Sequence, residues 1–179
     1  MSTFLVLTVI GDDKPGLVEL LADTIARHSG NWLESNMAHL AGKFAGILRV
    51  SVADAHADAL IADLQKLSSV LRLVVEKVKL ADAAVRERSL RLTLVGNDRP
   101  GIIKEISHAL ALQHVNVEEL ATQCTTAPMS GESLFNAQAE LRVPADLDVH
   151  ALQRQLERLA DDLIVEIALE PLHRVICAA

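Results

Sequence analysis

The stretch that organises this chain is Phe4-Leu-Val-Leu-Thr-Val-Ile-Gly-Asp-Asp-Lys-Pro-Gly16. A similar stretch occurs 85 positions later, where Ser89 matches Phe4. It reads Ser89-Leu-Arg-Leu-Thr-Leu-Val-Gly-Asn-Asp-Arg-Pro-Gly101. The same offset relates Asn31 to Asn116. A period of this length is too long for one solenoid unit and suits a duplicated small domain. The sequence therefore predicts two related domains.

The two domains have predicted boundaries. We expect a first domain over residues 1–80 and a second over residues 89–179, with residues 81–88 as the linker. This segment is charged and rich in alanine, and it separates the last apolar run of the first copy from the first apolar run of the second. Each predicted domain falls within the usual size range of small domains.

Each copy opens with the pattern of a strand followed by a helix. Leu5, Leu7 and Val9 alternate within an apolar run, which predicts a strand. A turn over residues 11–16 follows, and its proline suits the first position of a helix. The apolar residues that then recur at helical spacing are Leu17, Leu20, Leu21 and Ile25, matched by Ile102, Ile103, Ile106 and Leu110.

The rest of each copy predicts two strands, a helix and a last strand. In the first copy the strands are expected near 32–40, 43–53 and 70–78, with a helix marked by Leu60, Leu64 and Leu67. In the second copy they are expected near 115–124, 135–143 and 164–169, with a helix marked by Leu152, Leu156, Leu159 and Leu163. The order is βαββαβ twice. It predicts an α+β protein of two ferredoxin-like domains, each with a four-stranded antiparallel sheet and both helices on one face.

Composition limits the classes of function. The chain has 17 Lys and Arg against 24 Asp and Glu, a net charge of −7, which disfavours direct binding to nucleic acid. No apolar run reaches the ~18–20 residues of a membrane span, and no secretory leader is seen, so we expect a cytoplasmic location. The uncovered sheet face and edge strand of each domain predict a homo-oligomer or another covering chain.

The turn between the first strand and the first helix is the candidate ligand site. Backbone N–H groups at a helix start lack partners and can receive a carboxylate, while aspartates can take an ammonium group. Glycines let a ligand approach the backbone. The predicted ligand-binding residues are Gly11, Asp12, Asp13, Gly16 and Asn31 in the first copy, and Gly96, Asn97, Asp98, Gly101 and Asn116 in the second. The alternative is that these residues only cap a helix and form a turn.

Topology constrains this site. The first two strands of a βαββαβ unit run parallel, so Asn31 starts at the end of the sheet opposite to Asp13. If two domains pair edge to edge by their second strands, Asn116 approaches Asp13 and Asn31 approaches Asp98. The hypothesis is two pseudo-equivalent sites at a domain interface.

Catalytic and metal signals are weak. The seven histidines form no metal-binding helical pair, no Cys-x-x-Cys is present, and no nucleophile or phosphate-loop motif occurs. Cys124 lies in a predicted strand and is expected to be a small buried residue. We therefore expect no enzyme activity, no metal and no cofactor.

The turns Asp-Asp-Lys-Pro-Gly (12–16) and Asn-Asp-Arg-Pro-Gly (97–101), each followed 15 residues after the glycine by Asn, resemble those of ACT domains. The resemblance covers about residues 3–79 and 88–170 and implies a small-molecule-sensing regulatory module. Gly11 and Gly96 depart from the ACT domains that carry a ligand-gripping side chain there. Residues 30–35 (Gly-Asn-Trp-Leu-Glu-Ser) and 42–48 (Gly-Lys-Phe-Ala-Gly-Ile-Leu) further resemble the glycine cleavage system transcriptional repressor family.

That second resemblance implies a protein that senses an amino acid, glycine being the expected ligand, and represses transcription indirectly. Its partner would be a separate DNA-binding activator of the glycine cleavage operon. One alternative is a regulatory subunit that acts in trans on an amino-acid or one-carbon enzyme. Another is a structural adaptor whose ligand sites are vestigial.

Overall fold

A computed structural model of the chain describes residues 1–78, 87–127 and 131–172. The chain divides into two compact units, residues 1–82 (unit 1) and 83–179 (unit 2). Most of the expected linker, residues 81–86, lies outside the described residues. Its last two positions belong to the first strand of unit 2, because that strand begins at Glu87.

Unit 1 has the predicted βαββαβ order with one short addition. A 3₁₀ turn (η1, Lys66–Ser69) follows the second helix and contains Leu67, which was expected within that helix. The main elements are β1 (Ser2–Asp12), α1 (Leu17–Arg27), β2 (Asn31–Leu40), β3 (Lys43–Ala53), α2 (Asp54–Gln65) and β4 (Leu71–Val78).

Unit 2 repeats this order. Its elements are β5 (Glu87–Asn97), α3 (Ile102–Leu112), β6 (Asn116–Thr126), β7 (Ser133–Pro144), α4 (Val149–Leu163) and β8 (Val165–Pro171). The strands extend by one to three residues beyond most of the ranges that the apolar pattern predicts. Polar ends of strands carry no alternation signal, so pattern alone places such boundaries poorly.

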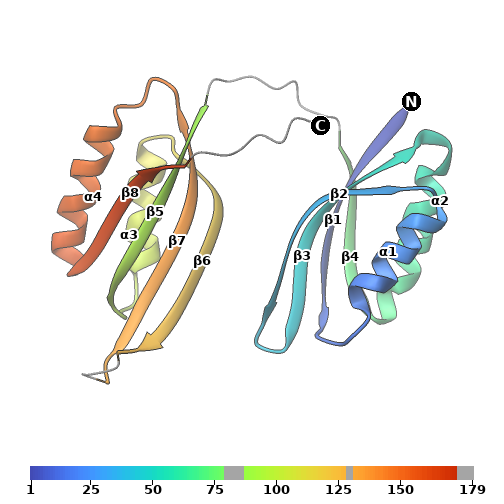
Figure 1. Ribbon diagram of the computed structural model, residues 1–179, viewed down its shortest axis with the longest axis horizontal. Coiled ribbons are helices and arrows are strands. Elements are labelled where there is room, and N and C mark those ends of the chain that lie inside the picture. Colours follow the sequence, from blue (N-terminus) through green and yellow to red (C-terminus); the bar gives the residue numbers. More distant parts are fainter. Residues whose placement is uncertain (79–86, 128–130, 173–179) are drawn as a thin grey trace. The chain divides into compact units, whose positions relative to one another are not determined.

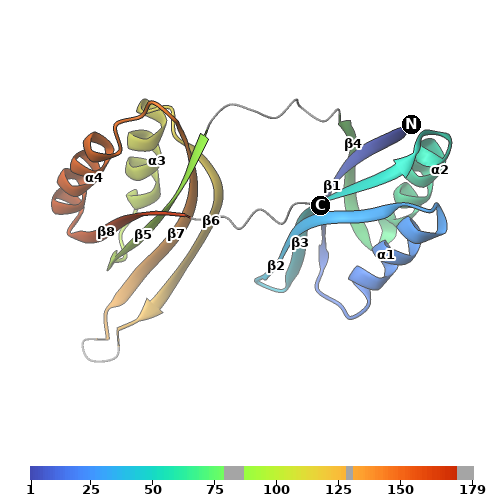
Figure 2. The same ribbon diagram turned by 45° about the horizontal axis from the view of Figure 1, so that its top comes forward.

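Each unit forms one four-stranded antiparallel sheet, in the order β2-β3-β1-β4 and β6-β7-β5-β8. Figures 1 and 2 show the two helices of each unit on one face of its sheet. The other face, which we call the open face, carries no helix in either unit. This arrangement confirms the predicted tandem ferredoxin-like fold.

The core of each unit lies between the sheet and its helices and is aliphatic. In unit 1 the alternating residues of β1 pack against Leu21 of α1 and Leu60 of α2. In unit 2 the predicted alternation along β7 is seen directly, since Ala137, Ala139 and Leu141 are all buried. The apolar alternation therefore identifies the buried face of both sheets correctly.

The first helix starts later than predicted. Pro15 was expected at its first position, but α1 begins at Leu17, and Gly16 is its N-cap with φ +91°. The same holds in unit 2, where Gly101 precedes α3 with φ +101°. No side chain caps either helix, so the aspartates of these turns are not helix caps. Glycine is favoured at both caps because left-handed backbone is strained for other residues.

The two helices of each unit are also linked by a polar contact. In unit 1, His28 Nε2 lies 2.8 Å from Asp63 Oδ2. In unit 2, Gln113 Nε2 donates to Gln155 Oε1 at 3.0 Å. Gln113 follows His28 by the repeat offset of 85. One helix-to-helix link is thus present in both units with different chemistry.

None of the helices in the described ranges is both long and apolar enough to cross a membrane.

Candidate functional site

The turn after β1 is tied by its backbone to the neighbouring hairpin. Asp13 donates its N–H to the carbonyl oxygen of Gly42 at 3.0 Å, and Asp98 donates in the same way to Ser133 at 2.9 Å. The turn is therefore held at the end of the sheet beside the β2–β3 or β6–β7 connection. Both turns keep this position, although their side chains differ.

The aspartates of the first turn interact with basic side chains. Asp12 forms an ion pair with Lys43, and the hydrogen bond and charge of this lysine lower the pKa of Asp12. Asp13 Oδ2 lies 3.7 Å from His39 Nε2, with both side chains largely exposed. Asp12 therefore stays ionised at neutral pH and can accept hydrogen bonds from a cationic group.

The glycine at the end of β1 has a packing role. A Cβ at Gly11 would lie 2.8 Å from both Leu71 Cδ2 and the carbonyl oxygen of Val70. At Gly96 a Cβ would lie 2.4 Å from Val165 Cγ1 and 2.8 Å from Val165 Cβ. Both glycines are therefore needed for the close approach of the last strand of their unit.

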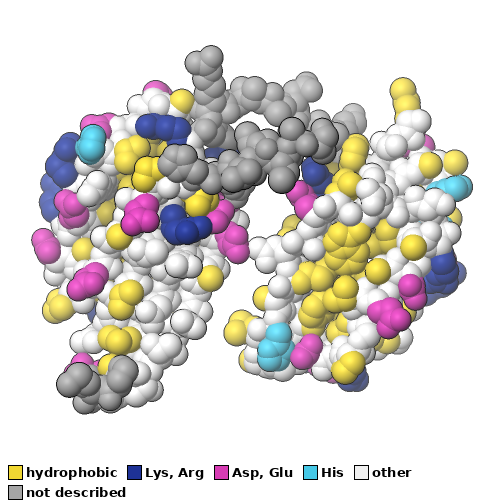
Figure 3. Space-filling model, in the orientation of Figure 1, with side chains coloured by type: hydrophobic (Ala, Val, Ile, Leu, Met, Phe, Trp, Pro, Cys, Tyr) yellow, Lys and Arg dark blue, Asp and Glu magenta, His cyan; other side chains and the backbone are white. Residues whose placement is uncertain are grey.

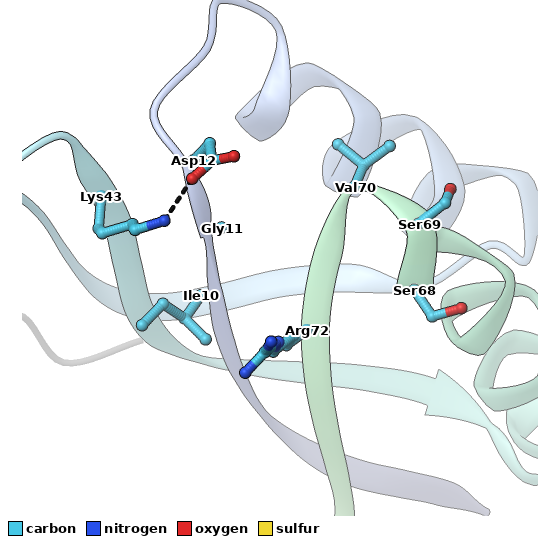
Figure 4. A pocket seen from close by; sticks show the side chains of 8 residues that line it. All are labelled: Ile10, Gly11, Asp12, Lys43, Ser68, Ser69, Val70 and Arg72. Atoms are coloured by element: carbon cyan, nitrogen blue, oxygen red, sulfur yellow. Dashed lines mark hydrogen bonds and ion pairs between the residues drawn. The ribbon is translucent and has the colours of Figure 1, made fainter.

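A cavity of about 420 Å³ lies beside the first turn, on the open face of unit 1. It sits where β1 ends and β4 begins, and Figure 4 shows Arg72 and Ser68 with the Asp12–Lys43 pair around it. Its lining residues are Ile10, Gly11, Asp12, Lys43, Ser68, Ser69, Val70 and Arg72. One carboxylate and two basic groups give this cavity a formal charge of +1.

Unit 2 has a cavity at the matching place, with a volume of about 540 Å³. The sheet register aligns the two, because Ile10 pairs with Arg72 and Val95 pairs with Glu166. The lining residues are Val95, Gly96, Asn97, Leu134, Ala160, Asp161, Ile164, Val165 and Glu166. Two carboxylates and no basic group give this cavity a formal charge of −2.

The structure brings some of the predicted site residues together and separates others. Gly11 and Asp12 line the first cavity, and Gly96 and Asn97 line the second. The remaining predicted residues line neither cavity. They are Asp13, Gly16, Asp98 and Gly101, which lie on the turns, and Asn31 and Asn116, which lie at the first residue of β2 and β6.

Asn31 is remote from the turn of its own unit, as the topology predicts. It pairs with Ser51, which pairs with Phe4 near the start of β1, whereas the turn follows the end of β1. With a rise of roughly 3.3 Å per residue, the two ends are separated by about 25 Å. A site that combines Asn31 with a turn aspartate such as Asp13 thus needs a second unit. The pairing of two units by their second strands stays a prediction.

Sequence reasoning missed the basic groups of the first cavity. Lys43 follows Gly42 at the β2–β3 turn, and Arg72 interrupts the apolar run of β4. The charge of Arg72 within this apolar run could have identified it as a candidate site residue, because a charged residue in an apolar strand lies on the solvent face or in a binding site. Ser68 and Ser69 could not be found, since serines after a helix are typical of any turn.

Cys124 is exposed, so the expectation of a buried small residue is wrong. Every residue of β6, the edge strand of the second sheet, is exposed. Loss of solvation around the thiol and the nearby Asp98 carboxylate raise the pKa of Cys124, which makes it a weak nucleophile.

Among the residues that the structure describes, no group of three or more His, Cys, Asp or Glu side chains could hold a metal ion.

Comparisons with known proteins place the fold. The ACT domain model matches residues 3–77, and none of the curated proteins matches the chain. A crystal structure of an unknown protein from Galdieria sulphuraria has a TM-score of 0.87 at 25% identity. It covers 97% of this chain and 100% of that one. A candidate glycine cleavage system transcriptional repressor has a TM-score of 0.70 at 16% identity, covering 97% and 99% of the two chains.

Both matches include residues of both units, since each covers 97% of this chain. The family model covers β1 to β4, which contain the first turn and its cavity. The first unit of this chain is thus similar to the ACT domain model, and the second unit has the same strand order.

Proposed function

We propose that this protein is an amino-acid sensor that represses transcription indirectly. Glycine is the expected ligand, and the target is a DNA-binding activator of the glycine cleavage operon. The ACT domain, the resemblance of residues 30–35 and 42–48 to the repressor family, and the fold shared with a candidate repressor support this proposal. The net charge of −7 favours a protein partner over nucleic acid.

The observation that carries the sensor is the cavity of unit 1. It offers both charges that a free amino acid requires: Arg72 for the carboxylate and Asp12 for the ammonium group. A guanidinium can bind a carboxylate through two parallel hydrogen bonds. Asp12 follows Ile10 by two residues on the same face, and Ile10 pairs with Arg72. Such diagonal neighbours lie roughly 7–8 Å apart, within the span of an amino acid and two side chains.

The surroundings suit a small polar ligand. Lys43 holds the Asp12 carboxylate in place, and Ser68 and Ser69 also line the cavity. The volume of about 420 Å³ is near the lower end of small-molecule pockets, which is about 300–1,000 Å³. Glycine and serine both fit this volume, so the volume does not select between them and their measured affinities must be compared.

The proposed site belongs to unit 1. In the matching cavity of unit 2, Asn97 replaces Asp12 and Glu166 replaces Arg72. A carboxylate ligand there would meet Glu166 and Asp161 without a basic partner, which is unfavourable. We therefore propose one amino-acid site per chain in place of the two equivalent sites that the repeat alone suggests.

Calorimetric titration of the purified chain with glycine, serine and alanine tests the sensor. We expect saturable binding that Asp12→Ala abolishes and the matched Asn97→Ala variant of unit 2 preserves. A folded protein that gives no heat with any amino acid would contradict the sensor and leave a protein-binding adaptor.

The repressor part is tested separately, by sedimentation of the chain mixed with the purified activator, with and without glycine. A complex whose affinity changes with glycine supports the proposal. If no complex forms, or if glycine does not change the affinity of the complex, the proposed coupling between glycine binding and activator binding is contradicted.

A further inference from the structure

The open face of unit 1 is unusually apolar for a surface. Ile10, Ile47 and Val74 are 45%, 50% and 58% exposed, and they lie on three adjacent strands. Figure 3 shows hydrophobic side chains gathered over the strands of this unit. A contiguous apolar patch of this kind usually marks a surface that binds another molecule.

The fold does not force this character, because the open face of unit 2 is apolar at fewer positions. The sheet registers align Val6 with Arg91 and Ile47 with Gln138. They also align Val74 with Ala168 on the last strand. At each position unit 1 has a large apolar side chain and unit 2 has a polar or small one. Ile10 is matched by Val95, which is apolar and 41% exposed, so the patch is larger in unit 1 but shares this one position with unit 2.

The charged side chains of the same face balance one another. The register places three acidic and three basic residues there: Glu34, Asp12 and Glu76, and Lys43, Arg49 and Arg72. Their sum is zero, although the whole chain carries −7. Two copies of this face can approach each other without net repulsion.

Two of these charges are arranged for self-pairing. Arg72 and Glu76 flank Val74 on β4, two residues to either side and on the same face. Arg49 is already paired with Glu34 at 3.0 Å, and Lys43 with Asp12. No ion pair is recorded within the described residues for Arg72 or Glu76. Their charges are therefore free for a partner.

Thr8, Ile47 and Val74 are neighbours across three adjacent strands and form a row perpendicular to the strands. A two-fold axis parallel to this row, between two copies of the face, brings complementary side chains together. Each strand then lies over the same strand of the second copy, in the opposite direction. Val74 meets Val74, Ile10 meets Val6, and Arg72 meets Glu76 of the second copy twice by symmetry. This is an isologous interface, in which sheets pack with strands within about 30° of each other.

We propose that the open face of unit 1 binds the open face of a second copy of this chain, centred on Val74 and closed by two Arg72–Glu76 pairs. Unit 2 fits the patch less well. Its open face would bury the Arg91–Glu140 ion pair and Gln138 against apolar side chains, and removing these polar groups from water costs free energy. A second copy instead covers Val74 with Val74 and Ile10 with Val6.

Sedimentation equilibrium of the full chain, over a range of concentrations and without ligand, tests the proposal. The wild-type chain should be a dimer, and Arg72→Glu should weaken the dimer about tenfold or more, because like charges then face each other twice. Glu76→Arg should do the same. The double variant Arg72→Glu/Glu76→Arg should recover at least half of the loss in log Kd.

A second pair of variants tests the apolar centre. Val74→Lys should give a folded monomer by circular dichroism, and the matched Ala168→Lys in unit 2 should leave the dimer unchanged. A monomeric wild-type chain, a dimer that ignores the single charge reversals, or a double variant as weak as the singles would overturn the proposed interface. So would equal effects of Val74→Lys and Ala168→Lys.

Discussion

The two units share their topology and sheet register, yet matched positions differ in chemistry. The cavity at the end of the first strand carries +1 in unit 1 and −2 in unit 2. The open face carries more large apolar side chains in unit 1 than in unit 2. The buried faces remain aliphatic in both. The duplicated core thus preserves the fold, while the surfaces of the two units have become specialised.

The link between the helices shows the same divergence in one contact. His28 and Asp63 hold α1 to α2 in unit 1, and two glutamines hold α3 to α4 in unit 2. Both pairs satisfy polar side chains at the same junction, so the link is structural. Only the first pair contains a carboxylate that titrates in acid, which gives a way to distinguish the units.

The largest expected effect concerns the glycines under the last strands. Gly11→Ala and Gly96→Ala should each destabilise their unit by about 1–3 kcal/mol, because the added methyl group overlaps neighbouring atoms. Gly96→Ala should cost more, because its methyl would lie 2.4, 2.8 and 2.9 Å from three atoms of Val165, whereas the two closest atoms at Gly11 lie at 2.8 Å. Chemical denaturation measures both. Trp32, the single tryptophan, packs on the core of unit 1 and reports that unit by fluorescence.

Equal costs for the two glycine variants, or costs near zero, would contradict the inferred close approach. An unchanged fluorescence transition in Gly96→Ala, with a shifted transition by circular dichroism, would show that the two units unfold separately.

The second effect concerns the amino-acid site. Arg72→Ala should raise the Kd for glycine about tenfold or more, because a hydrogen bond to a charged group contributes roughly 1.5–3 kcal/mol. Glu166→Ala, the matched change in unit 2, should leave this Kd unchanged. Calorimetry compares them. A similar loss in both variants would place the ligand elsewhere.

How much of this could be predicted from the sequence depends on the kind of signal. The repeat and the alternation of Leu5, Leu7 and Val9 predict the fold, because burial imposes a period of two on strands. The cavity could be predicted only at Gly11 and Asp12, which lie in the repeated turn. Lys43 and Arg72 enter it from other strands, and only the sheet register brings them there.

A third effect links the site to the proposed interface and depends on the sensor being correct. A ligand carboxylate and Glu76 of the second copy compete for Arg72, so saturating glycine should weaken the dimer by about threefold, roughly RT ln 3 or 0.65 kcal/mol. Sedimentation equilibrium with and without glycine measures this change. A dimer strengthened by glycine would exclude competition at Arg72 while leaving both binding events intact.

The smallest effect is the acid response of the helix link. Hydrogen bonds from Lys66 and His28 lower the pKa of Asp63 from 3.8 to about 2. A lowered folded-state pKa adds stability above about pH 4, and this stability is lost as pH falls towards 2. Asp63→Asn should therefore reduce the slope of the unfolding free energy of unit 1 against pH between these values. Urea unfolding followed by Trp32 fluorescence measures this slope. The matched Gln155→Glu change should introduce a pH dependence in unit 2. An unaltered slope in Asp63→Asn would refute the link as its source.

The most direct test of the central claim, an amino-acid site in unit 1 alone, is a titration of isotope-labelled protein with glycine followed by backbone amide NMR. We predict saturable shifts at Gly11, Asp12 and Arg72 with one glycine bound per chain, and no comparable shifts at Gly96, Asn97 and Glu166. Equal shifts in both sets, or two glycines per chain, would contradict the account.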